Sequence, residues 1–295
     1  MAGNSEKICW LYRLAFGRHP NRQVAQRFPS GAPGSAPDKL SCLTAFLRFG
    51  QMSQSRRVFL AAEWRDLLML NYEVEPTLLS RYVPPGTALD SFKGRTYVSL
   101  VGFQFRHTRL LGRFPVPFHI NFEEVNLRFY VRRQEGREER RGVVFIAEVV
   151  PRRAIATTAR LLYGENYTRL PMSHRIDAER SNKTIEYQWQ VAKRWCRLSA
   201  ETVGLPIHPQ EGSLEQFITE HYWGYSTQRN GRAGCIEYHV SHPSWRVWAT
   251  TKAEFEGNAS ALYGRELAAV IQQRPDCAFV ADGSPVIVFR SNRVQ

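Results

Sequence analysis

Residues 123–133 read E-E-V-N-L-R-F-Y-V-R-R, and this alternation points to the fold class. The apolar side chains share one face of an extended strand, which carries Val125, Leu127, Phe129 and Val131. The other face is polar and carries Glu124, Asn126, Arg128, Tyr130 and Arg132. A face of this kind is either solvated or turned toward an enclosed interior, and the alternation leaves both readings open.

The segments around this strand predict a sheet. Residues 95–106 have apolar side chains at both odd and even positions, which is typical of a strand covered on both faces. Residues 143–150 are almost wholly apolar, and the charged turn at 134–140 predicts a hairpin with the preceding strand. Residues 244–256 alternate again.

Turn and cap signals supply the remaining elements. The sequence D-G-S between residues 277–281 and 285–290 predicts a second hairpin. Ser213 with Gln216 forms a capping box ahead of a helix at 214–221, and two more helices are predicted at 259–273 and from Pro151 onward. We therefore predict an α+β, mostly β fold: a closed or nearly closed, antiparallel-rich β-barrel with three or four flanking helices.

The first 55 residues differ in composition from the rest. Residues 18–38 are rich in Pro, Gly and Ser, which predicts a linker rather than a strand or helix. Dense hydrophobic patterning begins just after Met52. We expect residues 1–55 to be a disordered or poorly ordered N-terminal extension and residues 56–295 to be one barrel domain. A true start at Met52, with the extension upstream of it, stays open as an alternative to a short N-terminal arm.

Charge and composition exclude several classes of protein. The net charge of +13 is spread along 295 residues without a basic stripe, so nucleic-acid binding is not expected. No apolar run is long enough to cross a bilayer, and the five cysteines are scattered, so we predict a cytoplasmic protein with reduced thiols. His239 and His242 would point to opposite faces of a strand, so no metal site or cofactor is predicted. The sequence does not decide whether the protein forms a homo-oligomer.

One set of polar residues is suited to binding a small carboxylate or carbonyl compound. If the polar face of residues 123–133 is enclosed, Glu124, Asn126 and Arg128 supply an acceptor, an amide and a fixed cation, and Glu148 interrupts the neighbouring apolar strand. Glu124 and Glu148 are candidates for an acid or base.

Two further clusters are candidates for the same site. Arg152 and Arg153 follow Pro151 where a strand is expected to give way to a helix, a place that favours anions; Arg152 is also a candidate catalytic residue. His221 and Tyr222 follow a helix end, where they either bind a ligand or pack on the core.

Seven segments together resemble the YqjF-like family of uncharacterised bacterial proteins. They are A-E-W-R-D-L-L-M-L-N-Y-E-V (62–74), Y-V-P-P-G-T (82–87), Y-V-S-L-V-G-F (97–103), P-F-H-I-N-F-E-E-V-N-L-R-F-Y-V (117–131), V-P-R-R-A (150–154), E-H-Y-W-G-Y (220–225) and A-D-G-S-P-V (281–286). That family is grouped with the acetoacetate-decarboxylase-like superfamily, so the resemblance implies a cone-shaped barrel with a buried polar cavity.

The resemblance also implies a lost reaction. In the decarboxylase a lysine after a proline at the end of an apolar strand forms a Schiff base, and the matching positions here are Arg152 and Arg153. Arginine stays protonated and is not an amine nucleophile. We expect a barrel that binds a small organic ligand or is a lyase or hydrolase without Schiff-base chemistry; the alternative is a structural or partner-binding module with a filled interior.

The lysines support the same expectation. Lys93 and Lys183 are predicted in turns, and Lys252 shares a strand face with Glu254, whose charge raises the pKa of the amine. Lys193 is not placed by the pattern.

Overall fold

The structure is a computed structural model that describes residues 57–115, 120–151, 166–179, 182–228 and 233–295. Strand accounts for 64% of it, with few helices. The strands are β1 (Val58–Val74), β2 (Ala88–Leu89), β3 (Thr96–Leu110), β4 (Phe114–Pro115), β5 (Phe122–Glu135), β6 (Glu138–Val150), β7 (Tyr167–Arg169), β8 (Met172–Glu179), β9 (Asn182–Val191), β10 (Arg194–Ile207), β11 (Trp223–Thr227), β12 (Cys235–Ser241), β13 (Val247–Glu256), β14 (Cys277–Phe289) and β15 (Asn292–Val294). The helices are α3 (Pro76–Leu79), the short 3-10 turn η1 (Ser80–Tyr82), α5 (Leu214–Thr219) and α6 (Ser260–Ile271).

Seven of these strands close into a ring. Hydrogen-bonded neighbours follow the order β12, β11, β6, β5, β3, β1 and β14, and β14 pairs with β12 to complete the circuit. Every pairing in the ring is antiparallel except that of β6 with β11. The prediction of a mostly β fold with a closed or nearly closed, antiparallel-rich sheet is confirmed.

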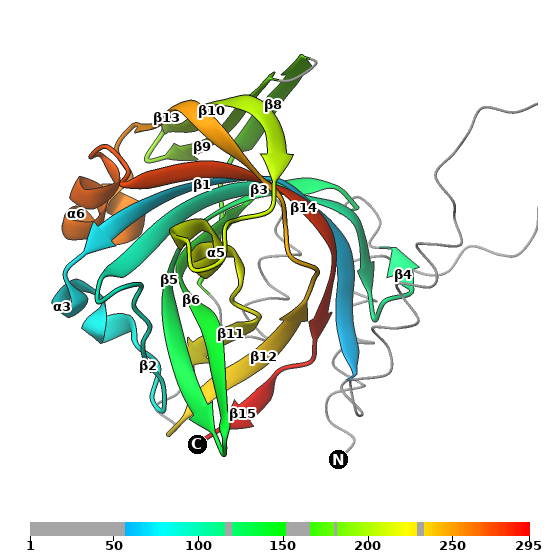
Figure 1. Ribbon diagram of the computed structural model, residues 1–295, viewed down its shortest axis with the longest axis vertical. Coiled ribbons are helices and arrows are strands. Elements are labelled where there is room, and N and C mark those ends of the chain that lie inside the picture. The colour runs from blue at the N-terminus through cyan, green and yellow to red at the C-terminus, as the bar shows by residue number, and fades with distance from the viewer. Residues whose placement is uncertain (1–56, 116–119, 152–165, 180–181, 229–232) are drawn as a thin grey trace, which may run out of the picture. The chain divides into compact units, whose positions relative to one another are not determined.

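The ring strands are covered on both faces. Helix α5 lies within the ring in Figure 1, and its Phe217 and Ile218 belong to the same apolar cluster as Met69 and Val101 of ring strands. On the outside, β9, β10, β13 and α6 form a second layer, and their apolar side chains pack against the outward residues of β3 and β5. Burial on both faces explains why residues 96–105 are buried without interruption.

The predicted hairpin between residues 123–133 and 143–150 is confirmed as β5 and β6. Their ladder runs from Val125 opposite Val149 to Glu135 opposite Glu138, with a bulge beside Arg128. The alternative of a solvated polar face is wrong, because residues 122–131 are buried at both odd and even positions. The polar side chains of residues 122–131 are therefore enclosed, whereas Arg132 beyond them is exposed.

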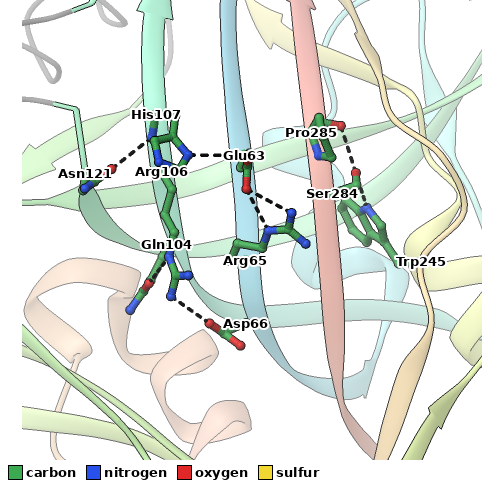
Figure 2. Close-up of polar contacts among 10 residues, drawn as sticks. All are labelled: Glu63, Arg65, Asp66, Gln104, Arg106, His107, Asn121, Trp245, Ser284 and Pro285. Atoms are coloured by element: carbon green, nitrogen blue, oxygen red, sulfur yellow. Dashed lines mark hydrogen bonds and ion pairs between the residues drawn. The ribbon is translucent and has the colours of Figure 1, made fainter. Parts of the chain in front are cut away.

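The predicted hairpin at D-G-S is wrong. Strand β14 continues through these residues and stays paired with β1 on either side of them. Gly283 has φ +76°, and a Cβ there would lie 2.0 Å from the carbonyl oxygen of Trp64, so the glycine allows two strands to approach closely rather than turning the chain. Figure 2 shows the neighbouring Ser284 accepting the indole N–H of Trp245 at 2.9 Å.

Strand β14 changes partners at this point. Before Gly283 it pairs with β13, and after it with β12, so one strand belongs to both the ring and the outer layer. Asp282 lies where the partner changes, and its carboxylate accepts hydrogen bonds from the backbone N–H and the guanidinium of Arg246.

Two of the predicted helices are confirmed. Ser213 caps α5 by accepting the backbone N–H of Gln216, and the Gln216 side chain accepts the backbone N–H of Gly212. Helix α6 covers residues 260–271 with a break at Gly264. The helix predicted after Pro151 lies outside the described residues, and no described helix is long and apolar enough to span a membrane.

Candidate functional site

Three polar residues of β5 point into the ring at alternate positions. Glu124 and Asn126 are each 2% exposed and Arg128 is 8% exposed. The intervening Val125 and Leu127 pack outward in the larger apolar cluster, because successive side chains of a strand point to opposite faces. The alternation seen in the sequence thus places two acceptors and a cation on one enclosed surface.

Glu124 lies in a cluster with Asn126, Tyr167 and Glu148. Asn126 Nδ2 donates to Glu124 Oε1 at 3.0 Å, and the Tyr167 hydroxyl donates to Glu124 Oε2 at 3.2 Å. Glu148 is opposite Asn126 in the β5–β6 ladder and opposite Tyr167 in the parallel pairing of β6 with β7. The Tyr167 hydroxyl is therefore hydrogen-bonded to Glu124, and Glu148 lies on the strand between them.

Burial sets the protonation of this cluster. Loss of hydration raises the pKa of Glu124 to about 7, although the hydrogen bonds from Asn126 and Tyr167 and the charge of Arg128 oppose the change. The pKa of Tyr167 is raised well above its usual value by burial and by the two neighbouring carboxylates. The hydroxyl keeps its proton, and Glu124 is half protonated near neutral pH.

Arg128 is a buried cation without a paired carboxylate among the described residues. Its Nη2 reaches the carbonyl oxygen of Ile218 at 3.4 Å and the sulfur of Met69 at 3.8 Å, and its guanidinium lies 5.8 Å from the Tyr130 ring centroid. Its Nε has no hydrogen-bond partner in the described part of the chain, and neither has the Oδ1 of Asn126. A donor and an acceptor thus remain available at adjacent inward positions.

His221 lies next to Arg128 across Tyr130, at a ring distance of 4.7 Å from the tyrosine. Its Nε2 is 3.1 Å from Asp90 Oδ2, which also accepts the Nε of Arg141 at 2.7 Å. Burial lowers the pKa of His221 to about 4, so the ring is neutral near pH 7. Asp90 and the Tyr130 ring thus hold His221 in place near Arg128.

Tyr222 lies in a different group. Its ring is 4.8 Å from His242, which stacks on Trp245 at 4.1 Å. Burial also lowers the pKa of His242 to about 4. None of the contacts of Tyr222 that the structure describes reaches Glu124 or Arg128.

Arg152 and Arg153 lie outside the described residues, so their part in the site stays a prediction. Within the described residues, Glu124, Asn126 and Glu148 lie together, and Arg128 follows on the same face of β5. In the described ranges no group of three His, Cys, Asp or Glu side chains could hold a metal ion.

The sequence analysis missed several inward polar residues. Ser99 joins the Asn71 Oδ1 and the Tyr130 hydroxyl, each at 2.6 Å. Asn71 and Ser99 each interrupt an apolar run, the same signal that identified Glu148. Tyr167 carries no such signal, because the three-residue strand β7 gives no alternation to read.

Three of the four lysines in residues 57–295 are exposed. Lys93 lies in the predicted turn, and Lys193 lies in the turn between β9 and β10 with φ +65°. The Lys252 ammonium is 2.8 Å from Glu254, and their hydrogen bond raises the pKa of the amine.

The prediction that Lys183 lies in a turn is wrong. Lys183 is the second residue of β9, its backbone N–H donates to Thr202, and its Nζ is 2.6 Å from Asp66 Oδ1. The amine also lies 4.5 Å from the Trp248 ring centroid. This partner, 117 positions away in the chain, draws the lysine into the sheet. None of the four lysines is on a ring strand.

Comparison with known proteins identifies one family. The model of the DUF2071 family, described as an uncharacterised conserved protein, matches residues 61–285. The uncharacterised protein YqjF of Bacillus subtilis (strain 168) is 27% identical over 173 residues, which is 57% of this chain and 67% of that protein.

Solved structures share the fold. An acetoacetate decarboxylase from Legionella pneumophila has a TM-score of 0.58 at 11% identity, covering 97% of this chain and 95% of its own. An acetoacetate decarboxylase-like enzyme from Sphingomonas wittichii RW1 has a TM-score of 0.57 at 15% identity, covering 80% and 93%. The enduracididine biosynthesis enzyme MppR complexed with pyruvate has a TM-score of 0.57 at 12% identity, covering 84% and 94%.

Proposed function

The chain belongs to the DUF2071 family of uncharacterised conserved proteins, and from this we propose that its strand ring binds a small organic carboxylate or carbonyl compound without forming a Schiff base. The observation that carries the proposal is Arg128, a guanidinium buried in the ring without a paired carboxylate among the described residues.

A buried charge without a partner is costly. Moving an ionised group out of water costs several kcal/mol even after relaxation, and a structural role normally supplies a carboxylate in return. At Arg128 the described partners are a carbonyl oxygen at 3.4 Å and a thioether sulfur. A ligand carboxylate would supply the missing charge through two parallel hydrogen bonds.

The rest of the inward face fits such a ligand. Asn126 Oδ1 is an acceptor without a described partner, and the carboxyl of Glu124, whose pKa is about 7, can donate or accept a hydrogen bond near neutral pH. One structural relative is described as complexed with pyruvate, a small molecule with both a carboxylate and a carbonyl group. We propose pyruvate and acetoacetate as the first compounds to examine.

The positions of the lysines support binding without a Schiff base. A Schiff-base lysine needs a neutral amine beside the ligand. The four lysines of residues 57–295 lie off the ring strands, and Lys183, the least exposed of them, is ion-paired with Asp66.

Calorimetric titration with pyruvate tests the proposal. We expect Arg128→Met to raise the Kd at least tenfold, since a hydrogen-bonded charge contributes about 1.5 to 3 kcal/mol and 1.4 kcal/mol is a factor of ten. Arg132→Met is the matched control, because Arg132 lies on the same strand with its guanidinium about half exposed. Equal affinity in the wild type and Arg128→Met would support the alternative of a structural module with a filled interior.

A further inference from the structure

We infer that the strand ring binds a carboxylate that also carries a hydroxyl group, and that Nδ1 of His221 accepts the hydrogen bond of that hydroxyl. This inference rests on the proposed function, because Arg128 must first bind the carboxylate. It narrows the ligand to a hydroxy acid, and it makes His221 the residue that distinguishes a hydroxy acid from a keto acid.

The hydrogen bond between His221 and Asp90 fixes which nitrogen of the ring carries the proton. Burial opposes ionisation of Asp90, but hydrogen bonds from His221 and Arg141 lower the pKa of its carboxyl, so Asp90 is a carboxylate and accepts. Nε2 of His221, 3.1 Å from Asp90 Oδ2, is therefore the N–H donor. Because burial lowers the pKa of His221 to about 4, the ring is neutral near pH 7 and Nδ1 carries a lone pair.

This acceptor has no hydrogen-bond partner within the described part of the chain. Nδ1 is buried, and the side chain of His221 is 1% exposed. Turning the ring over would not satisfy it, because one nitrogen would still donate to Asp90 and the other would still be an acceptor. Buried polar atoms normally have a partner, so a donor from outside the chain is expected here.

The free acceptor is close to the cation of the proposed site. Tyr130 follows Arg128 at the next inward position of β5, and its ring centroid is 5.8 Å from the guanidinium and 4.7 Å from the centroid of the His221 ring. The charge of Arg128 also acts on His221, so the two groups are within electrostatic range. They are near enough for one small ligand to contact both.

The chemistry of these groups selects a hydroxyl. Carboxylate and ketone oxygens only accept hydrogen bonds, so a keto acid leaves Nδ1 of His221 unsatisfied, whereas a hydroxyl has a proton to donate. An ammonium group also donates, but the charges of Arg141 and Arg128 both act against a cation at this ring. Asp90, which favours a cation there, is already ion-paired with Arg141 at 2.7 Å. A neutral donor is therefore favoured.

Asn126 is the other candidate to accept from the hydroxyl, since its Oδ1 also lacks a described partner. Its amide can be satisfied within the chain, however. Its Nδ2 donates to Glu124 Oε1 at 3.0 Å, and a half-turn of the amide would let Oδ1 accept a proton from Glu124, whose pKa is about 7. His221 has no such donor among the described residues, and the hydroxyl is therefore assigned to it.

Calorimetric titration with matched acids tests the inference. L-lactate and D-lactate carry a hydroxyl where pyruvate has its carbonyl oxygen, and the two enantiomers of 3-hydroxybutyrate differ from acetoacetate in the same way. In at least one pair we expect a hydroxy acid to bind about tenfold or more tightly than its keto acid, because the keto acid leaves a buried acceptor unpaired.

Two variants of His221 isolate the acceptor. His221→Gln keeps an amide at the place of Nε2, where it can donate to Asp90, but it removes the acceptor at the place of Nδ1 and should bind hydroxy and keto acids with similar affinity. His221→Asn puts an amide oxygen where Nδ1 lies and should keep the preference. The ratio of the two Kd values is the readout, since a general weakening of the site changes both. His208→Gln, at an exposed histidine, should keep the wild-type ratio.

The outcomes separate this inference from the proposed function. Hydroxy acids that bind no more tightly than their keto acids in both pairs overturn the inference and leave the proposed function standing. Failure of all these acids to bind overturns both. A preference for the hydroxy acid that persists in His221→Gln assigns the hydroxyl to another acceptor, such as Asn126, and overturns the role of His221. A preference that is lost in His221→Gln and kept in His221→Asn supports the inference.

Discussion

Two buried charged groups lie against opposite faces of the β5–β6 hairpin, and they differ in whether their charges are paired. On the outer face, Glu237 of β12 is 3% exposed and accepts hydrogen bonds from Arg140 at 2.9 Å and from the Tyr225 hydroxyl at 3.0 Å, with Arg133 at 3.5 Å. On the inner face, Arg128 has a carbonyl oxygen and a sulfur atom as its described partners.

The difference indicates which group holds the fold together. The Glu237 cluster joins the tip of the hairpin to β12, and its charges are met by side chains of the same chain. Buried polar groups that are fully satisfied within the protein are structural, whereas one that is left unsatisfied calls for a partner from outside. Mutations of the two groups are therefore expected to change the free energy of unfolding in opposite directions.

The largest loss of stability is expected at Glu237. Glu237→Ala removes the buried carboxylate that Arg133 and Arg140, each less than 15% exposed, share, and leaves them the more exposed Glu135 and Glu138 as carboxylate partners. Breaking a buried ion pair costs about 3 to 5 kcal/mol, and chemical denaturation would measure this fall in the free energy of unfolding. Glu139→Ala, which removes a half-exposed pair with Arg132, should cost less than about 1 kcal/mol. Similar losses at Glu237 and Glu139 would contradict the distinction.

At Arg128 the expected change in stability has the opposite sign. Arg128→Met replaces a buried charge by an apolar side chain of similar length next to Met69, and such replacements are neutral or stabilise the fold by about 1 to 4 kcal/mol. The same variant should lose affinity for pyruvate. A free energy of unfolding that falls by more than about 2 kcal/mol in the absence of ligand would show that Arg128 is structural, like the arginines of the outer face.

A smaller effect is expected from pH at Glu124. Its pKa is raised to about 7 in the fold, so the folded state binds this proton more tightly than the unfolded chain does. The resulting stabilisation is fully present below the unfolded pKa of about 4.5 and is lost as the pH rises through about 7. We expect the wild type to lose about 2 kcal/mol more than Glu124→Gln between pH 5 and pH 8.

Other groups near this face make the Glu124→Gln comparison necessary. His221 and His242 have pKa values lowered to about 4, so their contribution is lost as the pH falls, in the opposite direction. Tyr167, whose pKa is raised well above its usual value, keeps its proton over this range, and Glu148 is present in both proteins. Parallel curves for the wild type and Glu124→Gln would contradict a buried proton at Glu124.

Local patterns predicted the part of the fold that depends on neighbours in the chain. The alternation of residues 123–133 placed Glu124, Asn126 and Arg128 on one face, and the charged turn gave the β5–β6 hairpin. Whether that face is solvated or enclosed was not decided by the strand itself. It depends on closure of the ring by β12 and β14, a pairing between segments far apart in sequence.

The failures also arose from distant contacts. D-G-S has the composition of a turn, but Gly283 is needed because β1 lies too close for a side chain. Lys183 has the surroundings of a turn residue, yet Asp66 binds its amine from another strand. Tyr167 was missed because its importance comes from Glu124 and Glu148, which nothing in its local sequence reveals.

The smallest expected effect is the amount of Schiff-base adduct formed on the lysines. Here too the comparison is between a paired charge, that of Lys183, and one whose partner has been removed by mutation. Borohydride trapping with labelled pyruvate or acetoacetate should give no stoichiometric adduct on residues 57–295, because Lys93, Lys193 and Lys252 are exposed and Lys183 is ion-paired with Asp66 at 2.6 Å. Asp66→Asn removes that partner and is the strongest test, since it frees the least exposed of the four amines. Peptide mapping that finds an adduct on Lys183 in Asp66→Asn but not in the wild type would show that pairing keeps the amine unreactive. An adduct on any lysine of the wild type would contradict binding without a Schiff base.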